Sequence, residues 1–293
     1  MVNDIINLNI GEVYENIDLK KYTTYKVGGY AKVLVIPDNV DKLICLINYL
    51  NDNGIKYKII GNGSNLVFLG DYDGVLIKLD KLNSIDINDT LINVGAGCSL
   101  IFLALKCSRM GLTGLEFATG IPGTVGGAVY MNAGAYNDSM SDIIESIRVY
   151  DGNSIISLSK ADLLFGYRDS LLQHKKYICL DATIRLKHGD TLEILDLIEK
   201  RKQKRIESQP LEYPSAGSVF RNPENNSAWK LVEGIGYKGK CIGGACVSAK
   251  HANFIINIGN ASGNDIKTLV DEIKLNVKKK YDIDLKCEQE FVE

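Results

Sequence analysis

Apolar residues recur three and four positions apart in four segments of the chain, the spacing of a helix that buries one face. The first segment is followed by Gly54, a common residue just past the end of a helix. The second follows Ser99, a candidate N-cap, and precedes Gly111, while Pro210 closes the third. The pattern predicts helices over residues 40–53, 100–110, 191–206 and 265–280.

Shorter runs either alternate apolar and polar residues or are wholly apolar, and both patterns are typical of strands. They predict strands over residues 55–60, 66–69, 75–79, 91–94, 144–150, 154–158, 177–186 and 254–258. The chain is therefore expected to begin as a layer of strands and helix. A chain of 293 residues is typical of two domains or one large one. We place a domain boundary near the end of the third helix.

The composition is that of an ordinary globular protein, with 45% hydrophobic and 24% charged residues. The 34 basic and 36 acidic residues leave a net charge of −2, whereas a general nucleic-acid surface needs a basic excess. A basic cluster does occur at residues 200–205, but cations near the C-terminus of a helix complement its dipole. We therefore expect no nucleic-acid partner.

The seven cysteines are odd in number and include no C-x-x-C pair, so the sequence predicts neither a disulfide framework nor a zinc cluster. His174, His188 and His251 lack the spacing of metal ligands, and no metal is expected. The N-terminus lacks a basic stretch followed by an apolar one, and the long uncharged window at residues 117–137 is too rich in glycine for a lipid-facing helix. These features favour a cytoplasmic protein with no membrane span.

A glycine-rich loop at residues 61–65 joins two predicted strands. Its backbone N–H groups can face one direction, and its Asn and Ser side chains add polar ends, which suits the oxygens of a pyrophosphate. A plain tight turn is the alternative. The loop does not open a helix as a Rossmann G-x-G-x-x-G does, and it lacks the lysine of a Walker loop, so those two modes of nucleotide binding are disfavoured.

A second glycine-rich segment covers residues 120–135, where side chains are small at many positions. Such a segment is typical of backbone that lies against a flat ligand. The two segments lie about sixty residues apart in the sequence. Together they indicate one extended ligand, such as a dinucleotide.

Three polar residues elsewhere have both a chemical and a structural interpretation. Arg168 lies beside aromatic residues and would by default form a surface ion pair. Ser218 lies in a turn that can expose its hydroxyl, but it stands in no G-x-S-x-G motif and has no obvious base beside it, so a hydrolase triad is disfavoured. Glu288 would by default be a solvated carboxylate at a strand end. The residues alone leave these alternatives open.

Six motifs, in their order and spacing, resemble those of the UDP-N-acetylenolpyruvylglucosamine reductases in the compact form of that family. They are TTYKVGG (23–29), GNGSN (61–65), TGIPGTVGGAVYMNAGAY (119–136), YRDS (167–170), QPLEYPSAGSVFRNP (209–223) and GGACVSAKHANFIIN (243–257). The resemblance implies a flavoenzyme of peptidoglycan precursor synthesis. It would use NADPH to reduce the enolpyruvyl group of UDP-N-acetylglucosamine enolpyruvate to the lactyl ether of UDP-N-acetylmuramate.

The resemblance also implies an α+β fold. A two-part FAD-binding unit of the vanillyl-alcohol-oxidase (PCMH) type is expected, followed by a C-terminal α+β substrate-binding domain. We assign residues 1–80 and 81–205 to the two FAD-binding parts and residues 206–293 to the substrate-binding domain. FAD is the expected cofactor and NADPH the co-substrate, and no obligatory protein partner is evident.

Arg168, Ser218 and Glu288 fall on the catalytic positions of that family. Hydride transfer from the flavin to the terminal enolpyruvyl carbon leaves charge beside the carboxylate, with which Arg168 can pair. A protonated Glu288 can hydrogen-bond to that charge, and Ser218 can protonate the neighbouring carbon. The residues expected at the substrate are Tyr167, Arg221 and Asn222, and those expected at the cofactor are Gly61, Asn62, Gly63, Ser64, Asn65, Gly123, Thr124, Gly126, Gly127, Ala128, Asn132 and Ala133.

The C-terminus departs from the family pattern. The family ends L-E-P-E followed by a β-branched and a basic residue, whereas residues 285–290 of this chain read LKCEQE. The register of Leu285 and of residues 291–292 selects Glu288 over Glu290, although residues two apart in a strand share a face.

Two other functions are compatible with parts of the sequence. One is an oxygen-using sugar or alcohol oxidase on the same flavin fold, which has no reason to carry Arg168 and Ser218. The other is a non-catalytic regulator that binds a UDP-sugar. Turnover with NADPH and the enolpyruvyl sugar distinguishes the reductase from both.

Overall fold

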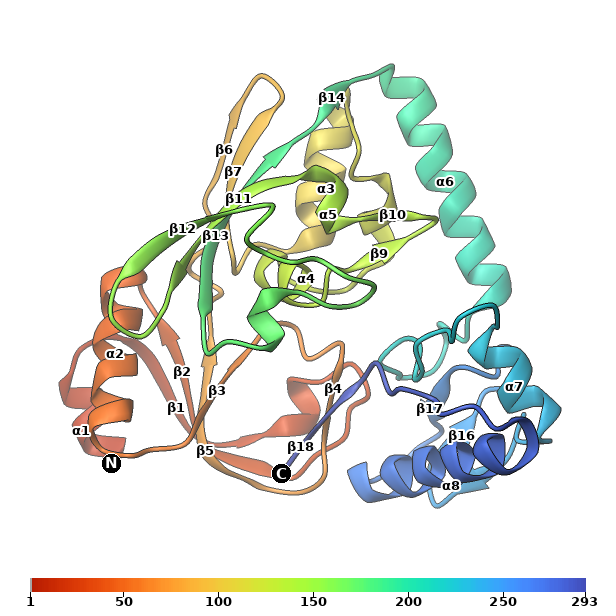
Figure 1. Ribbon diagram of the computed structural model, residues 1–293. Coiled ribbons are helices and arrows are strands. Elements are labelled where there is room, and N and C mark those ends of the chain that lie inside the picture. Colours follow the sequence, from red (N-terminus) through yellow and green to blue (C-terminus); the bar gives the residue numbers. More distant parts are fainter. Residues whose placement is uncertain (1) are drawn as a thin grey trace. The chain divides into compact units, whose positions relative to one another are not determined.

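The computed structural model describes residues 2–293, which divide into two compact units (Figure 1). Unit 1 contains the N-terminal residues as far as Glu15, together with Val33–Gly61 and Gly74–Gln203. Unit 2 contains Asn16–Lys32, Asn62–Asp73 and Lys204–Glu293. Each unit has a hydrophobic core of its own. The three-part division proposed from the sequence stays a prediction.

The first sheet has the strand order β1-β2-β5-β3, and β3 runs parallel to β5. Its strands are β1 (Gly11–Asp18), β2 (Tyr30–Pro37), β3 (Tyr57–Ile60) and β5 (Tyr72–Lys78). The first predicted helix is confirmed as α2 (Val40–Asp52), which begins where the side chain of Asn39 accepts a hydrogen bond from the backbone of Lys42. Its apolar face enters the core of unit 1.

The second sheet belongs to unit 1 and has the order β12-β11-β13-β7-β6, all antiparallel. Its strands are β6 (Ile85–Asn88), β7 (Leu91–Gly95), β11 (Ile144–Tyr150), β12 (Ile155–Ser159) and β13 (Ile178–Arg185). Helix α3 (Leu100–Arg109) follows β7, and the predicted N-cap Ser99 accepts a hydrogen bond from Phe102. Gly111, with a φ of +72°, ends this helix as expected.

Short elements complete unit 1, and most of them carry too few residues to show a period in the sequence. They are α1 (Val2–Asn7), α4 (Val125–Tyr130), α5 (Met140–Ile143), β8 (Leu112–Thr113), β9 (Gly134–Ala135), β10 (Asp138–Ser139), β14 (Lys187–His188), and the 3₁₀ turns η2 (Glu116–Gly120) and η3 (Leu171–Gln173). The third predicted helix is confirmed as α6 (Thr191–Ser208).

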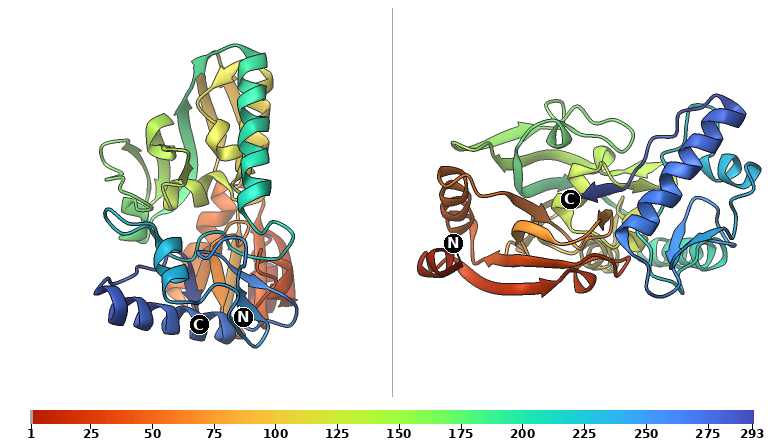
Figure 2. Two further views of the ribbon diagram at one scale, coloured as in Figure 1. Left: turned by 90° about the vertical axis from the view of Figure 1, so that its right-hand side faces the viewer. Right: turned by 90° about the horizontal axis from the view of Figure 1, so that it is seen from below.

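Unit 2 is built around the three-stranded sheet β15-β16-β17 and the long helix α8, which lies alongside it (Figure 2). The elements of unit 2 are η1 (Leu19–Lys21), β4 (Leu66–Phe68), α7 (Ala228–Gly234), β15 (Cys241–Ile242), β16 (Ala245–Val247), β17 (Ile255–Asn257), α8 (Gly263–Tyr281) and β18 (Glu290–Val292). A capping box of Ser262 and Asp265 starts α8 two residues before the predicted start. No helix within residues 2–293 is both long and apolar enough to cross a membrane.

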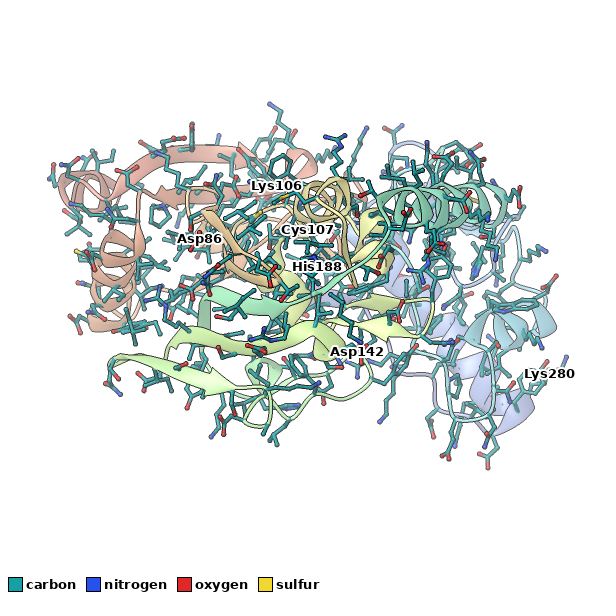
Figure 3. All side chains as sticks on the ribbon, turned by 90° about the horizontal axis from the view of Figure 1, so that it is seen from above. Asp86, Lys106, Cys107, Asp142, His188 and Lys280 are labelled. Carbon is teal, nitrogen blue, oxygen red and sulfur yellow. A yellow bond between two sulfur atoms is a disulfide. The ribbon has the colours of Figure 1, made fainter. Side chains whose placement is uncertain are left out.

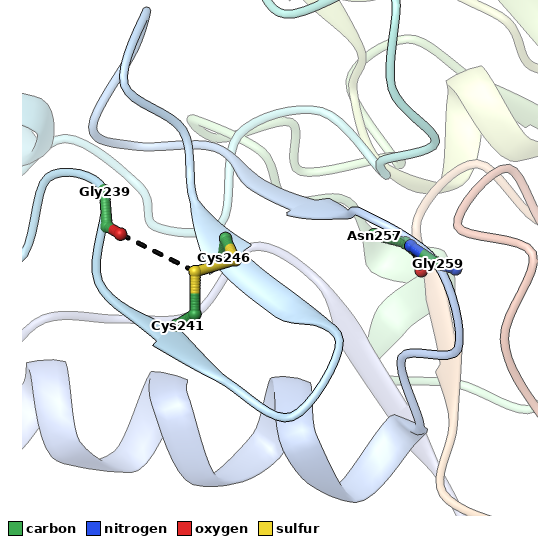
Figure 4. Close-up of a disulfide and its surroundings, with 5 residues drawn as sticks. All are labelled: Gly239, Cys241, Cys246, Asn257 and Gly259. Carbon is green, nitrogen blue, oxygen red and sulfur yellow. Dashed lines mark hydrogen bonds between the residues drawn. A yellow bond between two sulfur atoms is a disulfide. The ribbon is translucent and has the colours of Figure 1, made fainter.

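Cys241 and Cys246 form a disulfide, which corrects the expectation drawn from the cysteine pattern (Figure 4). They are directly opposite each other in the β15–β16 hairpin, with their Cα atoms 4.0 Å apart. The turn between them contains Gly243, whose φ of +53° suits a two-residue hairpin. A search for C-x-x-C pairs misses this bond, because the two sulfurs are brought together by strand pairing.

The remaining thiols are mostly enclosed. Cys98, Cys107 and Cys179 are buried, and burial raises the pKa of Cys107 to about 11 and that of Cys179 to about 12. Figure 3 shows Cys107 on α3 beside its neighbour Lys106. Thiols with raised pKa values are poor nucleophiles, so these cysteines act as small apolar side chains.

Candidate functional site

The two glycine-rich segments meet at Gly61. A Cβ atom at this position would lie 2.7 Å from Oγ1 of Thr124, so only glycine lets the backbone approach so closely. The structure therefore brings the two predicted cofactor segments together in unit 1. Nothing local in the sequence links them, since they lie far apart along the chain.

The rest of the first loop lies in unit 2, against the segment that precedes Tyr25. Gly63 has a φ of +63°, and a Cβ there would lie 1.9 Å from the carbonyl oxygen of Tyr22. The backbone N–H of Thr24 donates to the Gly63 carbonyl at 3.4 Å. Asn62 is exposed and Ser64 half-buried, which leaves both side chains at the edge of the loop.

The loop also has a buried hydroxyl beside it that the sequence reasoning missed. Oγ1 of Thr24 is buried and has no hydrogen-bond partner among residues 2–293. A buried polar atom without a partner is rare in native proteins and indicates a missing polar ligand or water. The TTYKVGG motif contained this residue, but its pattern gave no reason to choose it over Thr23, whose hydroxyl bonds to the Val27 backbone.

Thr124 organises the second glycine-rich segment. Its Oγ1 caps α4 by accepting a hydrogen bond from the N–H of Gly127 at 3.3 Å. The N–H of Gly126 donates to the Ala96 carbonyl at 2.8 Å, and a Cβ at Gly126 would lie only 2.9 Å from the Ala96 side chain. These glycines therefore let α4 approach the chain that leaves β7.

The neighbouring residues of this segment are held by backbone bonds. The Gly123 carbonyl accepts from the N–H of Leu100 at 3.0 Å, and the Ala128 carbonyl accepts from that of Ala133 at 2.8 Å. Asn132 was expected at the cofactor, and the structure places its amide in the protein interior. Its Nδ2 donates to the Gly166 carbonyl at 2.8 Å, and its Oδ1 accepts from the Ser141 N–H at 2.9 Å.

Arg168 lies in the tight turn of residues 166–169. The first residue of this turn, Gly166, accepts the hydrogen bond from the Asn132 amide through its carbonyl. The Arg168 backbone has a φ of +56°, a conformation that non-glycine residues seldom adopt. The guanidinium donates through Nη2 to the carbonyl of Gly134 at 2.6 Å and lies 5.2 Å from the ring centre of Tyr167. These two contacts, to a backbone carbonyl and to an aromatic ring, anchor the guanidinium within unit 1.

One residue of the basic cluster also belongs to this region of unit 1. Arg201 of α6 lies 4.7 Å from the ring centre of Tyr136 and pairs with Asp138 at 3.1 Å. Its Nη1 is buried and has no hydrogen-bond partner in the described part of the chain. The helix-dipole interpretation of the cluster did not single out this residue, because the contacts come from a segment about sixty residues earlier.

Ser218 and Glu288 lie on paired segments of unit 2. Phe220 forms an antiparallel bridge with Cys287, and the N–H of Glu288 donates to the Val219 carbonyl at 2.8 Å. Ser218 and Glu288 are both half-buried. The structure therefore brings these two predicted residues together.

Asn65, Arg221 and Asn222 lie close to the same segments. Nδ2 of Asn65 donates to the Glu288 carbonyl at 3.0 Å, and the backbone N–H of Arg221 donates to the Lys286 carbonyl at 2.9 Å. Oδ1 of Asn222 accepts from the N–H of Ala228 at the start of α7. The Asn222 amide thus has a structural contact in addition to any contact with a ligand.

Comparison with known proteins identifies the two parts of the chain. Residues 31–158 match the FAD binding domain, and residues 209–292 match the C-terminal domain of UDP-N-acetylenolpyruvoylglucosamine reductase. The reductase of Caldanaerobacter subterraneus is 45% identical over 287 residues, which cover 97% of this chain and 95% of the relative. That of Bacillus subtilis is 41% identical over 296 residues, which cover 100% of this chain and 98% of the relative.

A solved structure agrees with these relatives. The reductase of Thermus caldophilus superposes with a TM-score of 0.82 at 34% identity, over 96% of this chain and 99% of its own. An FAD-binding domain joined to this C-terminal domain defines a flavin-dependent oxidoreductase.

The chain belongs to the UDP-N-acetylenolpyruvoylglucosamine reductase family. It is an FAD-dependent, NADPH-using enzyme of peptidoglycan precursor synthesis, a UDP-N-acetylmuramate dehydrogenase. The fold class, function and cofactor predicted from the motifs are confirmed, and the oxidase and regulator alternatives are set aside.

Proposed function

We propose that Arg168, Ser218 and Glu288 act on the enolpyruvyl group of UDP-N-acetylglucosamine enolpyruvate. When bound, FAD would serve as the hydride carrier between NADPH and the substrate. Ser218 donates its hydroxyl proton to the carbon that bears the carboxylate, and solvent restores that proton afterwards. A serine is a weak acid, so this step requires a strongly basic carbanion and a dry site.

The other two residues stabilise charge. The guanidinium of Arg168 pairs with the substrate carboxylate, for which its two parallel N–H groups are suited. Glu288, in its protonated form, donates a hydrogen bond to the negative charge that develops beside that carboxylate. The observation that carries the proposal is the backbone pairing of the segments that bear Ser218 and Glu288.

We place FAD against the two glycine-rich segments. Their contact at Gly61 and Thr124, within unit 1, supports this placement, because a pyrophosphate needs closely approaching backbone. We propose the same cofactor residues that the resemblance implies. Asn132 also binds the carbonyl of Gly166 in the turn that bears Arg168.

Tyr167, Arg221 and Asn222 are proposed contacts of the UDP-sugar. The side chain of Tyr167 is exposed beside Arg168, where a substrate can reach it. UDP-sugars and NADPH are cytoplasmic metabolites, so the same proposal places the enzyme in the cytoplasm.

Ser218→Ala provides the test. We expect the purified variant to bleach normally when NADPH is added without oxygen, because flavin reduction needs no proton from Ser218. Recovery of the yellow colour on addition of the enolpyruvyl sugar should then slow by at least about a hundredfold, the upper part of the usual range for a general acid. Unchanged recovery would show that another group donates the proton.

A further inference from the structure

Two buried amide side chains hold the segment of Ser218, one on each side of it. The first is Asn253, which is 4% exposed. Its Oδ1 accepts from the N–H of Phe220 at 3.0 Å, and its Nδ2 donates to the Phe220 carbonyl at 2.9 Å. Its own carbonyl accepts from the N–H of Val219 at 2.9 Å. Asn253 thus satisfies backbone groups that a neighbouring strand would satisfy in a sheet.

The second amide is Gln289, which is also 4% exposed. Its Nε2 donates to the carbonyl of Ala216 at 3.1 Å, just before the turn that bears Ser218. Its Oε1 accepts from the hydroxyl of the fully buried Tyr25 at 3.2 Å, which fixes the orientation of the amide.

Gly217 lies between these two contacts, and its carbonyl accepts a long hydrogen bond from Nε2 of Gln289 at 3.5 Å. Gly217 has a φ of +70°, and a Cβ built on it would meet nothing within 4 Å. A glycine in open space allows many backbone conformations, so the direction of the Ser218 hydroxyl depends on contacts on either side. On one side the contact comes from Gln289, and on the other from Asn253 together with the backbone pairing of Val219 and Phe220 with residues 287–288.

We propose that Asn253 and Gln289 are positioning residues that direct the Ser218 hydroxyl toward the substrate carbon. This inference rests on the proposed role of Ser218 as proton donor. Loss of either amide leaves Ser218 in place but lets its segment shift, and a shift of about 1 Å can lower a rate about a hundredfold.

The alternative is that the two amides only stabilise unit 2. Asn257 provides a matched control, because it is also a buried asparagine with several hydrogen bonds. Its amide contacts the carbonyl of Tyr25 and the N–H groups of Gly259 and Ala261, and none of these bonds reaches residues 216–220. A purely structural role predicts the same behaviour for Asn253 and Asn257.

The experiment compares Asn253→Leu, Gln289→Met and Asn257→Leu as full-length holoenzymes in anaerobic stopped flow. We expect all three to bleach with NADPH at rates within about twofold of the wild type. Recovery with the enolpyruvyl sugar should slow by at least about tenfold in Asn253→Leu and Gln289→Met, and not in Asn257→Leu. Hydrogen exchange of the Val219 and Phe220 amides should accelerate in Asn253→Leu, as seen by mass spectrometry.

A double variant separates positioning from other effects. Gln289→Met in a Ser218→Ala background should cause no further loss in recovery, because the amide acts through the hydroxyl. A further loss as large as in the wild-type background would overturn the proposal, as would equal slowing of both half-reactions in all three single variants.

The outcomes also distinguish this inference from the assignment on which it rests. If Ser218→Ala alone recovers at the wild-type rate, the proton donor has been misassigned. If Ser218→Ala is slow but the amide variants recover normally, only the positioning role is wrong. Should Gln289→Met fail to fold, Tyr25→Phe keeps the ring and removes only the hydroxyl that orients the amide. It is expected to slow recovery in the same direction, and a normal rate would again contradict the proposal.

Discussion

Arg168 adopts a backbone conformation that its residue type does not favour. The third position of its tight turn has a φ of +56°, where glycine or asparagine is usual. Left-handed backbone costs an ordinary residue about 1–2 kcal/mol, and such strain is concentrated at functional sites. We therefore expect that Arg168 serves the proposed function through its side chain and does not stabilise the turn.

Arg168→Gly tests this interpretation. Relief of the strained backbone should offset much of the loss of the charge-assisted hydrogen bond to the Gly134 carbonyl, which is worth about 1.5–3 kcal/mol. We expect Tm to stay within about 4 °C of the wild-type value, while kcat/KM for the enolpyruvyl sugar falls by at least about a hundredfold. Differential scanning fluorimetry and steady-state kinetics provide the two readouts. A large fall in Tm with normal kinetics would assign Arg168 a structural role.

His251 links pH to the stability of the segment that holds Ser218. Burial lowers the pKa of His251, and its Nδ1 accepts a hydrogen bond from the N–H of Asn253 at 3.2 Å. Only the neutral imidazole can accept this bond. Because the native pKa lies below the unfolded one, the unfolded chain takes up the proton first as the pH falls, so stability is lost on acidification.

The free energy of unfolding should therefore decrease as the pH falls below about 6.5, the ordinary pKa of histidine. His251→Gln removes the titrating group and should make this dependence shallower. Urea unfolding at about pH 7.5 and about pH 5.5 measures both slopes. Equal slopes in the two proteins would show that His251 does not contribute.

At the scale of elements, the β15–β16 hairpin is joined by a disulfide although the other described cysteines are free. Cys241, one of the two bonded residues, is exposed, so a reductant can reach the disulfide. A bond that closes so short a loop restricts the unfolded chain only modestly. The chain-entropy relation gives about 2 kcal/mol for it.

Thiol labelling tests the pairing. In the native, unreduced protein we expect rapid alkylation of Cys45 only, because it is the exposed free thiol of the described chain. Unfolding without reductant should expose five thiols, and reduction should raise the number to seven. Reduction should also lower the free energy of unfolding by about 2 kcal/mol. Seven thiols in the unfolded, unreduced protein would show that the pair is reduced.

At the scale of the whole molecule, each unit is assembled from segments that are distant in sequence. The core of unit 2 contains Tyr25, Val27 and Val67 together with residues of the C-terminal segment. The last strand, β18, pairs in parallel with β4. The C-terminal segment therefore depends on the N-terminal part of the chain for both core packing and strand pairing.

A fragment of residues 204–293 tests this dependence. It lacks the three N-terminal core residues and the partner of β18, so we expect no cooperative thermal transition and poorly dispersed amide NMR signals. The full-length protein serves as the control. A cooperative transition in the fragment would instead support an independent domain that begins near residue 206.

The sequence by itself determined what depends on local periodicity and on contiguous motifs. The helices α2, α3, α6 and α8 follow from apolar spacing and caps, because helical hydrogen bonds join residues only four apart. The six contiguous motifs, among them those that contain Arg168 and Ser218, were sufficient to indicate the family, whereas the segment around Glu288 departs from its pattern. These features are encoded within short stretches and do not require knowledge of the fold.

Only the tertiary structure decided which distant groups meet. It paired Cys241 with Cys246, placed Gly61 against Thr124, left the Thr24 hydroxyl without a partner and brought Gln289 to Tyr25. These contacts arise from strand pairing and core packing between separate segments, and no local pattern records them. The physical reason is that a hydrogen bond needs two partners within about 3 Å, wherever they lie in the sequence.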